Sequence, residues 1–162
     1  SLFKSQTKGQ QDSIKNFCKK ISKAKNSKIS DDLQIVARVE SFILGQGLND
    51  ALKRAEAYSK AGADAILIHS KEKTPNEIFS FAKKFKKSKF FKPLIAVPST
   101  YSKTTESVLY KNGFKIVIYA NQMLRAAYPA MQNIARTILK NKRAYEAEKY
   151  ITPISEVIGL IK

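Results

Sequence analysis

Four short apolar, β-branched runs, each followed by an amphipathic stretch, dominate the chain from Gln34 onward. The runs lie near residues 35–41, 65–70, 94–98 and 115–120. Nearly continuous apolar strands are typical of parallel sheets, and the stretches between them carry apolar residues at helical spacing. The pattern therefore predicts an α/β fold of four consecutive βα units, which is half of a TIM-type (β/α)8 barrel.

The amphipathic stretches carry recognisable start and stop signals. Residues 74–77 are interpreted as a capping box with proline at the first helical position, and Gly62 suits the position just after a helix. The helix after residues 74–77 has the expected buried stripe Ile78, Phe81, Ala82 and Phe85. A long helix near the C-terminal end, about 124–140, carries the stripe Leu124, Ala127, Tyr128, Met131, Ile134, Ala135 and Ile138.

These signals divide the chain into three expected segments. Residues 1–33 hold a polar loop followed by a helix from Ser13 to about Ala24. Residues 34–141 hold the four βα units and the long helix, and residues 142–162 form a tail with a short helix.

The strongly basic composition raises the possibility of nucleic-acid binding. The net charge is +17, but nearly all of the positive charge is lysine, and runs such as 83–87 fall on expected solvated helix faces. No aromatic-interleaved basic motif or nucleic-acid module is present. We therefore expect no nucleic-acid partner, and a basic RNA-binding module is kept as an alternative of a different class.

The cellular setting is predicted from weaker signals. No run of 18 apolar residues is present, and the first residues show neither an initiator methionine nor an apolar signal core. A chain that starts this way is either processed or cut from something longer. The lone Cys18 has no cysteine to pair with inside the chain, which fits a reducing compartment. We expect a cytoplasmic protein without a membrane partner.

Polar residues cluster at the ends of the predicted strands, where barrel enzymes place their active sites. The candidates are Arg38, Glu40, His69, Ser70, Ser99, Thr100 and Asn121.

Two of these candidates have both a functional and a structural interpretation. Arg38 lies among apolar strand residues and suits either a bidentate clamp on a phosphate or carboxylate, or a salt bridge to Glu40. His69, the only histidine, suits donation to an anionic oxygen, acid–base catalysis or metal binding, but also a purely structural role. Without a second histidine or a cysteine cluster, we expect no zinc site within this chain.

Several segments taken together resemble the phosphoenolpyruvate mutase family of the isocitrate lyase superfamily. The resemblance covers nearly the whole chain and is carried by residues 36–43, 47–48, 51–58, 61–71, 97–101, 118–121, 124–126 and 151–158.

The resemblance implies the second half of the family's barrel and an activity. The family interconverts phosphoenolpyruvate and phosphonopyruvate, moving a phosphoryl group between oxygen and carbon in phosphonate biosynthesis. On the matching positions, Arg38 and His69 would hold the phosphoryl and enolate oxygens. Glu40 and Ser70 would support them from behind, and Ser1 and Leu2 would belong to a gating loop.

The resemblance also implies a cofactor and a partner. Mg²⁺ would be held by acidic residues of the family's first four βα units, which this sequence lacks, so the chain alone is expected to be inactive. The long helix would pack on another subunit in a homo-oligomer, a dimer or a tetramer. Three alternatives to the mutase are kept. The first is a phosphonopyruvate hydrolase, and the second is another carbon–carbon or carbon–phosphorus lyase of the superfamily. The third alternative is a non-catalytic fragment.

Overall fold

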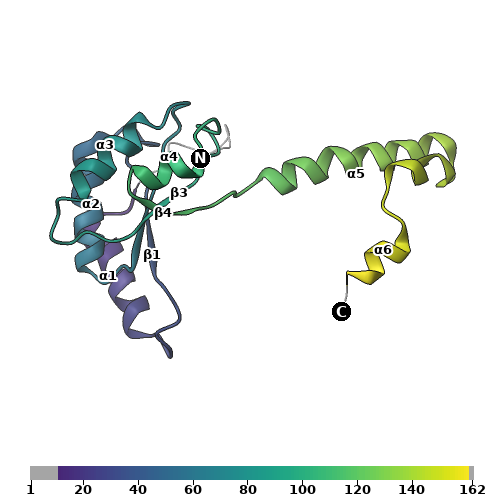
Figure 1. The fold of residues 1–162 in the computed structure, drawn as a ribbon. Helices are drawn as coiled ribbons and strands as arrows, with labels where there is room; N and C mark the ends of the chain where they lie inside the picture. Colours follow the sequence, from purple (N-terminus) through teal and green to yellow (C-terminus); the bar gives the residue numbers. More distant parts are fainter. Residues whose placement is uncertain (1–10, 161–162) are drawn as a thin grey trace. The chain divides into compact units, whose positions relative to one another are not determined.

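The computed structural model describes residues 11–160, which form helices and four strands in alternation (Figure 1). The elements in chain order are α1 (Ile14–Asn26), β1 (Val36–Val39), α2 (Gly47–Lys60), β2 (Ala65–Ile68), α3 (Asn76–Phe85), β3 (Leu94–Ala96), α4 (Glu106–Lys111), β4 (Phe114–Val117), α5 (Gln122–Asn141), the 3₁₀-helix η1 (Tyr145–Tyr150) and α6 (Ile154–Gly159). Each predicted strand and helix is present, with the strands shorter than predicted.

The four strands form one parallel sheet in the order β1-β2-β3-β4. This chain-order arrangement needs a crossover between each pair of strands, and α2, α3 and α4 supply the crossovers. The prediction of an α/β fold with a parallel sheet is confirmed. Within the described residues β1 and β4 are the edge strands.

The edge strands β1 and β4 are buried mainly on the face that the helices cover, whereas the central strands β2 and β3 are buried on both faces. Ala37 and Val39 are 1% and 0% exposed and join the helical core, whereas Val36 is 42% exposed. At the other edge, Ile116 of β4 is 48% exposed although Phe114 is buried. One-sided burial follows from the period of two along a strand, which sends alternate side chains to opposite faces.

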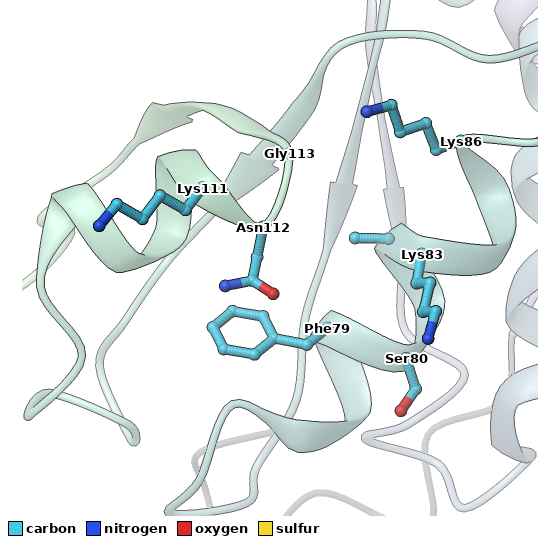
Figure 2. A pocket seen from close by; sticks show the side chains of 8 residues that line it. Phe79, Ser80, Lys83, Lys86, Lys111, Asn112 and Gly113 are labelled. Carbon is cyan, nitrogen blue, oxygen red and sulfur yellow. The ribbon is translucent and has the colours of Figure 1, made fainter.

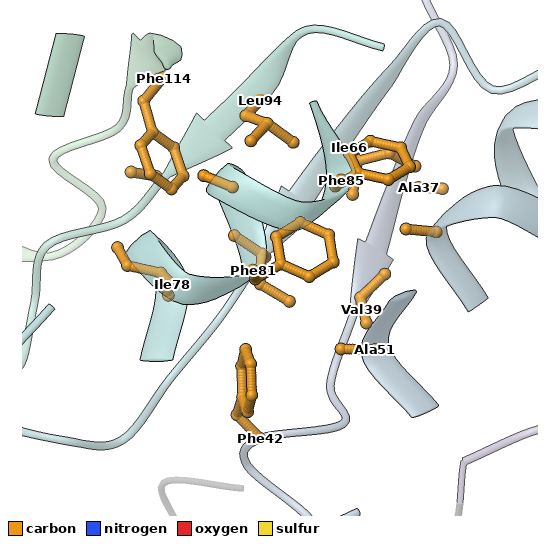
Figure 3. Packing of buried hydrophobic residues seen from close by; sticks show 14 of the residues in the cluster. Ala37, Val39, Phe42, Ala51, Ile66, Ile78, Phe81, Phe85, Leu94 and Phe114 are labelled. Atoms are coloured by element: carbon orange, nitrogen blue, oxygen red, sulfur yellow. The ribbon is translucent and has the colours of Figure 1, made fainter. Parts of the chain in front are cut away.

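The core fills the layer between the sheet and its helices (Figure 3). Phe81 and Phe85 of α3 stack with their ring centroids 5.3 Å apart, and both are 0% exposed. The predicted stripe of α3 is fully confirmed, since all of its members are buried: Ile78, Phe81, Ala82 and Phe85. The neighbouring lysines, at 83, 84, 86 and 87, are exposed.

The predicted capping box at residues 74–77 is wrong. Helix α3 begins after Pro75, and no side chain caps its N-terminus. Glu77, the residue expected to reach back to the cap, instead accepts a hydrogen bond from Ser70. The fully buried hydroxyl of Ser70 requires a hydrogen-bond partner, and Glu77 supplies it instead of bonding to the backbone at the start of α3.

Gly62 ends α2 as predicted, in a left-handed conformation with φ of 110°. A Cβ at this position would lie 3.3 Å from Cγ of Lys25 in α1, so the glycine also permits close packing of α1.

Packing divides the chain into one unit up to Ala120 and a second unit from Asn121. The second unit holds α5, η1 and α6, and the one buried residue in its described part is Ala147. Among the described residues, no helix is both long and apolar enough to span a membrane.

Adjacent residues of α4 provide a test of this packing. Leu109 is 0% exposed and Val108 is 42% exposed. We expect Leu109→Ala to lower the free energy of unfolding by about 2–5 kcal/mol, because it leaves a cavity in the core. Val108→Ala should change it by no more than about 0.5 kcal/mol. Urea unfolding measures both, and equal effects would contradict the described orientation of α4.

Candidate active site

Arg38 and Glu40 form an ion pair at the carboxyl end of β1, through Nε of the guanidinium and Oε1 of the carboxylate. The arginine side chain is 52% exposed and lies on the face of β1 opposite Ala37 and Val39. An exposed pair of this kind contributes little to stability. The contact occupies Nε, while a guanidinium has further N–H donors on its two terminal nitrogens that suit an oxyanion.

His69 follows β2 and lies beside the end of β1. Its backbone N–H donates to the carbonyl of Val39 over 3.4 Å. Nδ1 of the imidazole is buried and has no hydrogen-bond partner within residues 11–160. Burial and the nearby charge of Arg38 lower the pKa of His69, and Glu40 opposes them. The imidazole is therefore neutral at neutral pH, with one nitrogen able to donate and the other to accept.

Ser70 is completely buried beneath this strand end. Its hydroxyl donates to Oε2 of Glu77 at 2.5 Å and accepts from the N–H of Glu72 at 3.1 Å. Its carbonyl accepts a hydrogen bond from Oγ1 of Thr100 at 3.2 Å. Sequence reasoning listed Thr100 among the strand-end candidates but missed Glu77 as a neighbour of the site.

A second buried polar network supports the turn after β1. Ser41, which is 0% exposed, donates to Oδ2 of Asp50 at 2.7 Å, and Arg54 Nε donates to the same oxygen at 2.8 Å. A terminal nitrogen of Arg54 donates to the carbonyl of Asp12 at 2.9 Å and to the hydroxyl of Tyr58 at 3.0 Å. Sequence reasoning missed this network, although the i,i+4 spacing of Asp50 and Arg54 was a usable signal.

Asp64, which precedes β2, lies at the opposite end of the sheet. It accepts from the N–H of Ile35 at 2.8 Å and from Nζ of Lys25 at 2.5 Å, and these bonds lower the pKa of its carboxyl group. The carboxylate therefore joins α1 to β1 and is remote from the strand ends that carry Arg38 and His69.

The acidic residues of the described segment do not fit a Mg²⁺ site. No group of three or more histidine, cysteine, aspartate or glutamate side chains between residues 11 and 160 is placed to hold a metal ion. Glu40 is paired with Arg38, and Glu77 is bonded to Ser70. A hard divalent cation needs several oxygen ligands, which these residues do not supply.

A groove of about 360 Å³ lies between the C-terminal parts of α3 and α4 (Figure 2). Asn112 and Gly113 on its wall precede β4, so the groove belongs to the amino end of the sheet. Lys83, Lys86 and Lys111 line it, but their side chains point in different directions rather than toward one point. The groove is therefore separate from the strand-end site.

The remaining candidates are divided between the two units. Ser99 follows β3, where its N–H donates to the carbonyl of Val97 at 2.8 Å. Asn121 begins the second unit, and its N–H donates to Oε1 of Gln122 at 3.1 Å. Ser1 and Leu2, predicted to gate the site, lie outside the described residues.

A parallel sheet with helices on one face is typical of enzymes built on α/β barrels, whose active sites lie at the carboxyl ends of the strands, and an arginine at such an end suits a phosphate group. The chain belongs to the phosphoenolpyruvate phosphomutase family, whose model matches residues 3–139, within the isocitrate lyase superfamily.

The relatives carry two different enzyme names. The chain is 44% identical over 147 residues to phosphoenolpyruvate phosphomutase of Tetrahymena pyriformis, covering 91% of this chain and 48% of the relative. It is 39% identical over 150 residues to phosphonopyruvate hydrolase of Variovorax sp. (strain Pal2), covering 91% of this chain and 50% of the relative.

A solved structure of the same family also resembles this chain. A crystal structure of phosphonopyruvate hydrolase in complex with oxalate and Mg²⁺ matches with a TM-score of 0.84 and 34% identity, over 98% of this chain and 55% of that chain. The chain thus spans about half the length of the relatives that it matches.

The electrostatic link between Arg38 and His69 is directly testable, because His69 is the only histidine. Replacing Arg38→Gln removes the positive charge that disfavours the imidazolium, so we expect the pKa of His69 to rise. The measurement is an NMR titration of the imidazole. Arg143→Gln, which breaks the ion pair with Glu146 in the second unit, is the matched control and should have no effect.

The same titration predicts how stability depends on pH. Since the folded pKa lies below the unfolded value of about 6.5, the unfolded chain binds the proton more readily. The contribution of His69 to the free energy of unfolding is complete above about pH 6.5 and is lost as the pH falls through the folded pKa. An unchanged pKa in Arg38→Gln would contradict the electrostatic link.

Proposed function

We propose that this chain supplies the phosphoryl-binding half of an enzyme that interconverts phosphoenolpyruvate and phosphonopyruvate. The observation that carries the proposal is the pair formed by Arg38 and the neutral His69 at adjoining strand ends, with Arg38 exposed on the face of β1 opposite the helical core. The family membership and the 44% identity to a phosphoenolpyruvate phosphomutase support the same assignment. In this proposal the sheet is the second half of a TIM-type barrel.

The two side chains suit different parts of the reaction. A phosphoryl group in transit is loosely bonded, and its charge is spread over the outer oxygens. The terminal N–H groups of Arg38 hold these oxygens and neutralise their charge, while Glu40 keeps the guanidinium in place. The neutral imidazole of His69 donates an N–H to an oxygen of the substrate without adding a second full positive charge.

The complete enzyme requires more than this chain. Mg²⁺ would supply charge neutralisation at the substrate oxygens, and its ligands would come from the half of the family's length that the chain does not span. Ser1 and Leu2 would take part in gating. We therefore propose that the chain alone is inactive, and that the assembled enzyme is cytoplasmic, acts on small molecules and binds no nucleic acid.

The second candidate activity is hydrolysis of phosphonopyruvate, favoured by the 39% identity to a hydrolase and by the hydrolase structure. The two activities differ in the fate of the phosphoryl group. With phosphonopyruvate as the substrate, a mutase gives a phosphate ester, whereas a hydrolase gives inorganic phosphate. Phosphorus NMR separates these products in one experiment.

The role of Arg38 is testable in a chimaera in which this chain replaces the matching segment of the Tetrahymena pyriformis enzyme. Arg38→Lys keeps the charge but loses the planar fork of donors, so we expect turnover to fall by about 100-fold or more. Arg143→Lys, in the second unit, should retain turnover and serves as the control. Normal turnover in Arg38→Lys would remove Arg38 from the proposed site.

Helix α5 supports the proposal of a homo-oligomer. None of its residues is buried, and Leu124, Tyr128 and Met131 are 68%, 58% and 59% exposed. An apolar helical stripe of this size is typical of a helix that packs on a partner.

A charge on this stripe should disrupt the association. We expect the chimaera to be a dimer or tetramer by light scattering, and Met131→Asp to shift it toward the monomer. Asn133→Asp, on the opposite side of α5, should leave the assembly intact. A monomeric chimaera, or equal behaviour of the two variants, would contradict association through α5.

A further inference from the structure

Ser70, the residue directly after His69, is held from several directions at once. Its side chain is 0% exposed, and its hydroxyl donates to Glu77 in the first turn of α3. The same hydroxyl accepts from the backbone of Glu72, and its carbonyl accepts from Thr100, which follows β3. A helix and two loops therefore converge on one buried residue.

The contact between Glu77 and Ser70 goes beyond what the helix requires. A carboxylate in the first turn stabilises a helix through the helix dipole, and it does so without any particular partner. Here the Glu77 carboxylate accepts a 2.5 Å hydrogen bond from a buried hydroxyl seven residues earlier. Such charge-assisted bonds are among the stronger ones in proteins, so this bond constrains the chain between β2 and α3.

Between residues 11 and 160, the imidazole of His69 has no comparable hydrogen bond. Its Nδ1 has no hydrogen-bond partner within residues 11–160, and its backbone N–H makes only a 3.4 Å contact with Val39. The direction of the ring therefore depends on how firmly the backbone at residues 69–70 is held. The bonds from Glu77 and Thr100 supply that restraint.

We propose that Glu77 and Thr100 are positioning residues for His69, and that both act through Ser70. Glu77 acts through the Ser70 hydroxyl, and Thr100 acts through the Ser70 carbonyl. Their catalytic consequence rests on the proposed function, but their structural effect on His69 does not. Neither residue touches the substrate in this account, since each contacts Ser70 rather than the reacting atoms.

The test uses the chain itself, because its single histidine gives one imidazole signal in an NMR titration. Burial is the main cause that lowers the pKa of His69, so loosening the residue admits water and raises that pKa. We expect Thr100→Val and Glu77→Gln each to raise it toward the ordinary value of about 6.5. Thr100→Ser, which retains the hydroxyl, should keep the wild-type pKa.

The controls separate positioning from other effects. Arg38 and Glu40 are the charged side chains within residues 11–160 that act on the pKa of His69, and no variant alters either of them. Thr137→Val removes a similar bond, from Thr137 Oγ1 to the carbonyl of Asn133 in α5, and should leave the His69 titration unchanged.

Combining the substitutions with Ser70→Ala tests the two routes. In the Ser70→Ala background, Glu77→Gln should have no further effect, because its partner hydroxyl is gone, whereas Thr100→Val should still raise the pKa. Unchanged titration in both Thr100→Val and Glu77→Gln would overturn the proposal. A full effect of Glu77→Gln without the Ser70 hydroxyl would overturn the route through that hydroxyl.

A parallel assay in the Tetrahymena pyriformis chimaera separates this proposal from the proposed function. Thr100→Val should lower kcat by roughly 10-fold, with Thr100→Ser restoring it, because misplaced catalytic groups lose rate. If the titration shifts but Arg38→Lys leaves turnover intact, the proposed function fails and the restraint on His69 stands. If Arg38→Lys is inactive but neither Thr100→Val nor Glu77→Gln shifts the titration of His69, the positioning role fails and the proposed function stands.

Discussion

Packing of the helices on one face of a parallel sheet is the constraint on which the rest of the first unit depends. The helices take the face of the sheet that carries Ala37 and Val39, and the alternate side chains of β1 remain exposed. Because all four strands run the same way, their carboxyl ends lie at one end of the sheet. Arg38 and His69, from separate strands, lie together at that end. The structural pair of Asp64 and Lys25 lies at the opposite end.

Electrostatics then determines what the strand ends can do. Arg38 is exposed and paired with Glu40, while His69 remains neutral because burial and the arginine disfavour the imidazolium. A fixed cation beside a neutral donor suits a substrate whose charge is spread over several oxygens. The described residues supply no cluster of carboxylates for a metal ion, so the chain accounts for only part of the proposed chemistry.

Sequence patterns predicted the elements well and the side-chain networks poorly. The stripe of α3 and the role of Gly62 follow from helical periodicity and backbone geometry, which are local properties. The bond from Thr100 to Ser70 joins residues 30 positions apart, and that from Arg54 to Asp12 joins residues 42 apart. The apolar periodicity of a helix or a strand contains no information about contacts between residues so far apart in the sequence. Glu77 was misassigned because its spacing fitted a cap, whereas the buried hydroxyl of Ser70 required its carboxylate. The predicted roles of Arg38 and His69 came from resemblance and remain proposals.

The central claim is that this chain provides the phosphoryl-binding side chains but needs the other half of the family's length to act. The most direct measurement is phosphorus NMR of phosphonopyruvate with Mg²⁺, using the purified chain alone and then mixed with the half of the Tetrahymena pyriformis enzyme that it does not match. The account predicts no new signal from the chain alone, and a phosphate ester signal from the mixture that disappears with Arg38→Lys. A phosphate ester formed by the chain alone would contradict it.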